Sequence, residues 1–229
     1  MRHGFFRPGL ACALVGLAAA AACGRAPVET ARTGEPAAAV VSRMKVVFLG
    51  DSLTAGYGLA PSEAYPSLLQ ARLQSAGLAA DVVNAGVSGD TSAGGLRRLD
   101  WALEGDVRVL VVALGANDAL RGLGTDDLRR NLTAIIERAR VRNVTVVLAG
   151  MEAPPNLGRD YTSAFRRVYR DLAEAYRIAL IPFLLDGVAG KPGLNQGDFI
   201  HTNAAGAMKV ADLVWPYVER AVREAGSDD

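Results

Sequence analysis

Short apolar runs alternate with amphipathic stretches from Met44 onward, and this alternation limits the possible folds more than any other feature of the chain. Continuous apolar runs, rich in valine, isoleucine and leucine, are typical of strands that are buried on both faces. The strand candidates are residues 44–49, 81–84, 108–114, 143–149 and 179–183. The helix candidates are residues 63–76, 92–103, 125–140, 160–177 and 203–224. The alternation predicts parallel βαβ units and a three-layer α/β domain.

The N-terminal segment lies outside this pattern and is predicted to be a signal peptide of lipoprotein type, residues 1–22. Basic residues precede an apolar stretch at residues 9–22, which is shorter than the about 20 apolar residues that span a bilayer. Cys23 follows three alanines and is the candidate lipidated residue, although Ala20 stands where such sites usually carry leucine. The alternative is an ordinary cleavage site with an incidental cysteine.

Residues 23–43 are rich in alanine, proline and threonine without apolar periodicity, which predicts a flexible linker. We expect an exported, periplasmic protein that is anchored to a membrane only by a lipid on Cys23; the alternative is a soluble periplasmic or secreted protein. The other cysteine, Cys12, leaves with the signal peptide, so no disulfide is expected within the body. A net charge of +1 without a charged run indicates no nucleic-acid partner.

Three turns that follow predicted strands carry residues capable of chemistry, at the sheet edge where parallel strands gather their ligands. Ser52 follows the first strand between glycines and can expose its hydroxyl, or merely cap a helix. Gly89 follows the second strand and can direct its N–H at an oxyanion, or belong to a turn into a helix capped by Asp90 or Thr91. Asn117 follows the third strand and can donate its amide to the same oxyanion, or only shape a turn.

The segment Asp198-Phe199-Ile200-His201 is the most informative one. The chain has two histidines, and His3 lies in the predicted signal peptide, so histidine chemistry in the mature protein falls on His201. A lone histidine is usually structural, but Asp198 can accept from one ring nitrogen and leave the other to take a proton from a hydroxyl. A single histidine without a body cysteine excludes an ordinary His/Cys zinc site, and no cofactor or metal is expected.

The motifs GDSLTAGYGL, NAGVSGDTS, LGANDALRG and the terminal D-x-x-H resemble, in this order, the four blocks of the SGNH (GDSL) hydrolase superfamily. They are most similar to its bacterial thioesterase I/lysophospholipase L1/arylesterase branch, and the resemblance covers about residues 44–215. It implies that residues 44–229 form an SGNH hydrolase domain. The fold expected is a flavodoxin-like α/β/α sandwich with a five-stranded parallel sheet.

The resemblance also implies a role for each of five residues. Ser52 is the expected nucleophile, His201 its base and Asp198 the residue that orients the base. Ser52, Gly89 and Asn117 are the expected oxyanion-hole donors, the first two through their backbone N–H groups.

Two positions differ from the usual residues of the superfamily, and these positions and one loop are relevant to substrate binding. Many members of the superfamily carry glycine where Phe199 stands and proline where Thr202 stands. Phe199 is a candidate substrate-binding residue, with burial in the core as the alternative. Pro154 and Pro155 belong to a loop expected at the same sheet edge, which either tunes substrate choice or is a plain connector.

The function expected from this resemblance is a serine esterase that hydrolyses small-molecule carboxylic esters through an acyl-enzyme. Aryl esters and short or medium acyl esters are the expected substrates, with thioesters and lysophospholipids as further candidates. One alternative is a carbohydrate O-acetylesterase, and another is a non-catalytic lipoprotein that binds a ligand. No obligate protein partner is expected.

Overall fold

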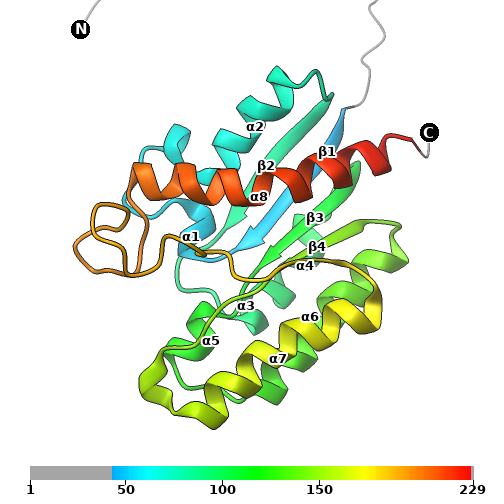
Figure 1. The fold of residues 1–229 in the computed structure, drawn as a ribbon. Coiled ribbons are helices and arrows are strands. Elements are labelled where there is room, and N and C mark those ends of the chain that lie inside the picture. Colours follow the sequence, from blue (N-terminus) through cyan, green and yellow to red (C-terminus); the bar gives the residue numbers. More distant parts are fainter. Residues whose placement is uncertain (1–42, 228–229) are drawn as a thin grey trace, which may run out of the picture. The chain divides into compact units, whose positions relative to one another are not determined.

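The structure, a computed structural model, describes residues 43–227 of the chain (Figure 1). The predicted signal peptide, Cys23 and the linker up to residue 42 lie outside the described residues. Five parallel strands form one sheet in the order β2-β1-β3-β4-β5, as in flavodoxin-like folds. They are β1 (Met44–Gly50), β2 (Ala80–Gly86), β3 (Val107–Ala113), β4 (Thr145–Ala149) and β5 (Ala179–Ile181).

Helices cover both faces of this sheet, which confirms the three-layer α/β/α sandwich (Figure 1). One face carries α2 (Tyr65–Ser75) and α8 (Ala204–Ala225), which pack on each other. The other face carries α3 (Ser92–Arg97), α4 (Leu99–Ala102), α6 (Thr125–Val141) and α7 (Arg159–Tyr176). Four short elements lie in the connections: α1 (Ser52–Ala55), α5 (Ala116–Leu120) and the 3₁₀ turns η1 (Pro61–Glu63) and η2 (Pro155–Leu157).

The two central strands supply the middle of the core. Residues 46–49 of β1 and 109–112 of β3 are all 0% exposed. Helices on both sides cover these strands, so each of these residues meets apolar neighbours whichever way its side chain points. This explains the continuous apolar runs in the sequence.

Three predicted elements differ from the structure for identifiable reasons. The single helix predicted at residues 92–103 is two helices, because it breaks at Arg98. The last strand ends at Ile181, and the next residue is Pro182, which has no N–H to donate to the sheet. The fourth strand begins at Thr145 rather than at residue 143, since Asn143 has a φ of +56°.

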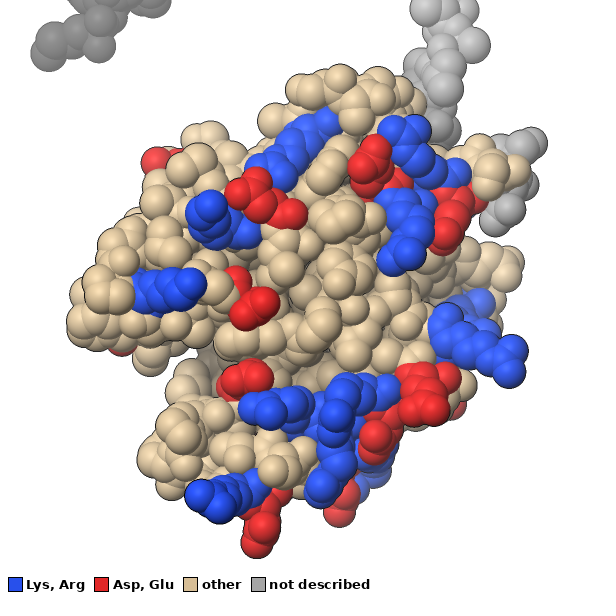
Figure 2. All heavy atoms as spheres, in the orientation of Figure 1, with Lys and Arg blue, Asp and Glu red and all other residues tan. Residues whose placement is uncertain are grey.

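Charged side chains of both signs are interspersed on the face shown in Figure 2. Ion pairs also join neighbouring helices, such as the pair of Arg129 on α6 with Asp171 on α7 at 2.6 Å. Such exposed pairs contribute about 0–1 kcal/mol each. Within residues 43–227, no helix combines the length and the apolar character that crossing a membrane requires.

Candidate active site

The carboxyl ends of three neighbouring strands lie level with one another. Gly50 at the end of β1 is paired with Gly86 of β2 and with Ala113 of β3. The chain order changes direction at β1, so this edge is the switch point where doubly wound sheets bind ligands. The segments containing Ser52, Gly89 and Asn117 therefore all begin at one place, as the sequence predicted.

The turn after β1 presents Ser52 as the first residue of α1. Asp51 is the N-cap, and its Oδ1 accepts from the Leu53 N–H at 3.0 Å. Ser52 is therefore not the helix cap, and its Oγ lies 2.8 Å from His201 Nε2. The helix approaches β2 so closely that a Cβ on Gly86 would lie 2.2 Å from the Ala55 nitrogen.

Asp198 and His201 form the hydrogen-bonded pair that their spacing predicted. Asp198 Oδ2 lies 2.6 Å from His201 Nδ1. Its Oδ1 accepts from the N–H groups of Ile200 at 2.9 Å and His201 at 3.0 Å. The hydrogen bond with His201, assisted by these two N–H groups, lowers the pKa of Asp198 from 3.8 to about 2. A charged carboxylate thus faces one ring nitrogen while the other faces the Ser52 hydroxyl.

The loop that carries this pair is held by contacts that the sequence reasoning missed. An antiparallel bridge joins Asn195 to Thr202, and the Gln196 side chain donates to the carbonyls of Tyr57 at 2.6 Å and Thr202 at 2.9 Å. The Tyr57 ring lies 4.7 Å from the His201 ring, centroid to centroid. Among these contacts, only that of Gln196 had a possible signal in the sequence, because a polar residue stands two positions before Asp198.

Asn117 is the second residue of α5, and its side chain reaches the turn that carries Ser52. Its Nδ2 lies 3.4 Å from Asp51 Oδ2, a long hydrogen bond that engages one of the two amide N–H groups. Asp51 is 2% exposed, and burial raises its pKa from 3.8 to about 6. Asn117 therefore bonds a side chain next to Ser52, beyond any role it has in shaping its own turn.

Gly89 lies in a turn whose geometry only glycine adopts readily. The Asp90 N–H bonds the Val87 carbonyl at 3.0 Å, and Gly89 has a φ of +83°. Arg121 donates to the Gly89 carbonyl at 2.7 Å. Thr91 caps α3 through its hydroxyl, so the structural alternative for this segment is also realised. The turn follows the end of β2, at the same edge of the sheet as Ser52.

A largely apolar pocket of about 360 Å³ is lined by Leu53, which follows Ser52, and by Ile200, which precedes His201. Phe199, Pro154 and Pro155, the three candidate substrate-binding residues, all line it. The other lining residues are Ala116, Leu120, Met151, Glu152, Ala153, Phe183, Leu185 and Ala189. Phe199 is 68% exposed, so it is not buried in the core, and it has a φ of +58°, in the left-handed region that glycine favours.

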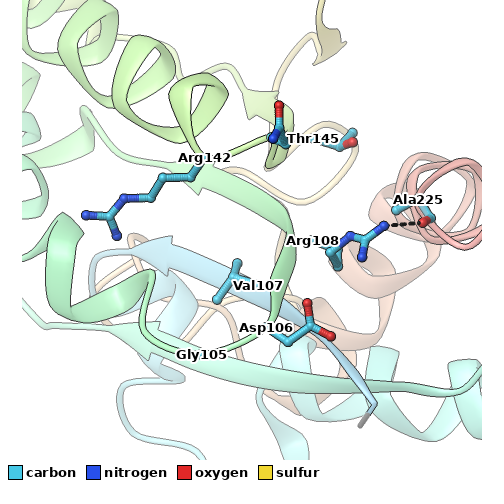
Figure 3. A pocket seen from close by; sticks show the side chains of 8 residues that line it. Gly105, Asp106, Val107, Arg108, Arg142, Thr145 and Ala225 are labelled. Carbon is cyan, nitrogen blue, oxygen red and sulfur yellow. Dashed lines mark hydrogen bonds between the residues drawn. The ribbon is translucent and has the colours of Figure 1, made fainter. Parts of the chain in front are cut away.

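A larger hollow of about 580 Å³ lies at the opposite edge of the sheet (Figure 3). It is lined by the starts of β3 and β4 and by the end of α8, and Arg108 there donates to the Ala225 carbonyl at 3.1 Å. Its lining residues, all described, include no serine, cysteine or histidine. In the described part of the chain, no group of three or more His, Cys, Asp or Glu side chains could hold a metal ion.

Residues 48–209 match the model of the GDSL-like lipase/acylhydrolase family. The chain belongs to this family. The match spans all the strands except the first residues of β1, and it includes Ser52, Gly89, Asn117, Asp198 and His201.

Relatives within the GDSL-like family cover most of the described domain. Esterase TesA of Pseudomonas aeruginosa is 43% identical over 172 residues, which are 75% of this chain and 86% of the relative. The thioesterase 1/protease 1/lysophospholipase L1 of Escherichia coli is 39% identical over 168 residues, 73% of this chain and 79% of the relative. The crystal structure of TesA superposes with a TM-score of 0.75 at 41% identity, over 78% of this chain and 99% of the other.

Proposed function

We propose that this GDSL-like hydrolase is a serine esterase that cleaves small carboxylic esters through an acyl-enzyme. The observation that carries the proposal is the chain of contacts from Ser52 Oγ to His201 Nε2 at 2.8 Å and from His201 Nδ1 to Asp198 Oδ2 at 2.6 Å. This is the arrangement that activates a serine hydroxyl and stabilises the imidazolium that forms. The esterase and thioesterase names of the two relatives support the same reaction class.

The proposed reaction has two displacements. Ser52 Oγ attacks the ester carbonyl carbon while His201 Nε2 takes the hydroxyl proton. His201 then returns the proton to the leaving alcohol, whose bond to the acyl carbon breaks. Water, deprotonated by His201, attacks the acyl carbon, and the bond to Ser52 Oγ breaks as His201 returns the proton to that oxygen, which releases the acid and restores the enzyme. Asp198 keeps Nδ1 protonated throughout and does not itself take up the proton.

The oxyanion of each tetrahedral intermediate is proposed to lie among three donors: the N–H groups of Ser52 and Gly89 and the second amide N–H of Asn117. The level ends of β1, β2 and β3 support this grouping. The Asn117–Asp51 hydrogen bond supports it further, because it turns the amide nitrogen rather than its oxygen toward the nucleophile turn.

The apolar pocket lined by Leu53 and Ile200, the sequence neighbours of Ser52 and His201, supports an acyl chain as the group bound on the acid side of the ester. Each methylene buried there contributes about 0.8 kcal/mol, so KM should fall about fourfold per carbon until the pocket is full. A panel of p-nitrophenyl esters, acyl-CoAs, lysophospholipids and acetylated sugars tests this. A preference for acetylated sugars over every acyl ester would favour the carbohydrate O-acetylesterase alternative.

The decisive variant is Ser52→Ala, which should abolish both p-nitrophenyl butyrate hydrolysis and labelling by a fluorophosphonate probe. Ser75→Ala is the matched control, because Ser75 is exposed at the end of α2 and bonds only the Ala71 carbonyl of its own helix. Labelling that persists in Ser52→Ala would reject Ser52 as the nucleophile. Failure of the wild-type protein to label at all would favour the alternative of a non-catalytic binding lipoprotein.

We also propose that the chain is exported and lipidated at Cys23, on the strength of the signal-like segment that ends there. Bacterial lipoproteins carry more than one acyl chain, and two chains give stable anchoring where a single one does not. The wild-type protein should fractionate with membranes and Cys23→Ser should not. A wild-type protein found wholly in the soluble fraction would reject lipidation and leave a soluble periplasmic or secreted protein.

A further inference from the structure

Arg98, at the break between α3 and α4, makes three short hydrogen bonds with one guanidinium. Its Nη2 donates to the Gly50 carbonyl at 2.8 Å, its Nη1 to the Ala85 carbonyl at 2.7 Å and its Nε to Asp90 Oδ2 at 2.6 Å. The side chains of Arg98 and Asp90 are 17% and 18% exposed. A charge-assisted pair so shielded from water is stronger than the exposed ion pairs of this surface.

The three acceptors belong to the two segments that carry proposed oxyanion donors. The Gly50 carbonyl is one peptide before the Asp51–Ser52 turn, and Asp90 is the residue after Gly89. Ala85 lies in β2, just before the chain leaves the sheet toward Gly89. The guanidinium thus bridges the end of β1 to both ends of the segment that holds Gly89.

We propose that Arg98 is a positioning residue that fixes the Ser52 turn and the Gly89 N–H at their working separation. This rests on the proposed esterase function. The planar guanidinium directs N–H bonds to three points at fixed angles, whereas a lysine ammonium on a flexible stem has no such fork. A preorganised oxyanion hole depends on such fixed geometry, because its donors must already point to where the charge develops. The helix break at Arg98 lets the side chain reach back to the sheet edge.

The test compares Arg98→Lys and Arg98→Ala with Arg129→Ala, the control that removes a surface arginine from the Asp171 ion pair. We expect both Arg98 variants to lose about 10–100-fold in kcat, since a misplacement of 1 Å can cost about 100-fold. KM should stay within about twofold, because the donors act mainly on the transition state. Inactivation by a fluorophosphonate should slow in parallel, and guanidinium chloride at millimolar concentration should partly restore Arg98→Ala.

A merely structural arginine would behave differently. If Arg98→Lys melts early but keeps kcat within about twofold of the wild type at a temperature well below its melting point, the proposal is overturned. If Arg98→Ala does not fold, Asp90→Asn replaces it, because it keeps both carbonyl bonds and removes only the charge. In the double variant, the losses in kcat from Asp90→Asn and Arg98→Lys should not add, since Asp90 acts through Arg98. Additive losses would also overturn the proposal.

The experiment separates this proposal from the esterase function itself. Wild-type turnover that disappears in Ser52→Ala tests the function before any Arg98 variant is measured. With that result in hand, unchanged kcat in the Arg98 variants rejects only the positioning role.

Discussion

Phe199 holds an unusual backbone conformation between the two members of the Asp–His pair. Its φ of +58° lies in the left-handed region, which costs a residue with a Cβ about 1–2 kcal/mol and glycine almost nothing. The ring is mostly in solvent, since the residue is 68% exposed. The position therefore combines a strained backbone with a side chain that contributes little to folding.

We predict that Phe199→Gly is more stable than Phe199→Ala. Both variants lose the same ring contacts, roughly 60 Å² or about 1.5 kcal/mol. Only glycine removes the Cβ strain, and its more flexible unfolded chain cancels roughly 0.5–1 kcal/mol of that gain. The free energy of unfolding should therefore be higher for the glycine variant than for the alanine variant by about 0.75 kcal/mol, the middle of a range of about 0–1.5, or by about 2–3 °C in Tm for a domain of this size.

Thermal unfolding of the two variants, followed by circular dichroism in one buffer, measures the difference directly. The control pair is Ile200→Gly and Ile200→Ala, because Ile200 is the next residue and is not among the described residues with positive φ. At that control position the order should reverse, with alanine the more stable. If Phe199→Ala is as stable as Phe199→Gly or more so, left-handed strain does not shape this turn.

Three further predictions concern polar side chains near Ser52. Asp198→Asn should lower kcat by up to about 10⁴ with little change in KM, and activity within a few-fold of the wild type in steady-state kinetics would contradict the tautomer role. Asn117→Ala should melt normally, label slowly with fluorophosphonate and lose about 10²–10³ in kcat, whereas early melting with normal turnover would make Asn117 structural. Burial raises the folded-state pKa of Asp51 from 3.8 to about 6, so its contribution to stability is present at low pH and lost as pH rises through that interval. Relative to Asp51→Asn, the free energy of unfolding of the wild type should therefore fall by roughly 3 kcal/mol between pH 3 and pH 8. If the free energies of unfolding of the two proteins change with pH in parallel, this prediction is wrong.

The sheet could be predicted because its central strands, β1 and β3, have runs that are buried on both faces. Residues 109–112 have no exposed side, so only apolar residues are tolerated there and the run is visible in the sequence. The break at Arg98 could not be predicted in the same way. Arg98 donates there to carbonyls at Gly50 and Ala85, which are far away in the sequence and meet it only in the folded chain.

The same distinction applies to the site. The contacts among Ser52, Asp198 and His201 could be predicted because their residue types suit the proposed chemistry and each stands in a recognisable motif. Asp51 belongs to the same motif, but its burial and its bond to Asn117 follow from the packing of α1 against neighbouring strands. The Tyr57 ring contacts the His201 ring, and nothing in the sequence pattern indicates that the two loops that carry them lie together.

Ser52 and His201 are separated by 149 positions, and the His201 loop is followed by α8, which packs on β3, β4 and α2. The nucleophile is thus synthesised well before its partner. A growing chain, or one truncated before residue 198, would hold a serine without a base and could not turn over an ester by the proposed mechanism. Recovery of hydrolysis during refolding would then report the docking of the segment that carries His201, and the enzyme's own substrate could serve as a clock for that step.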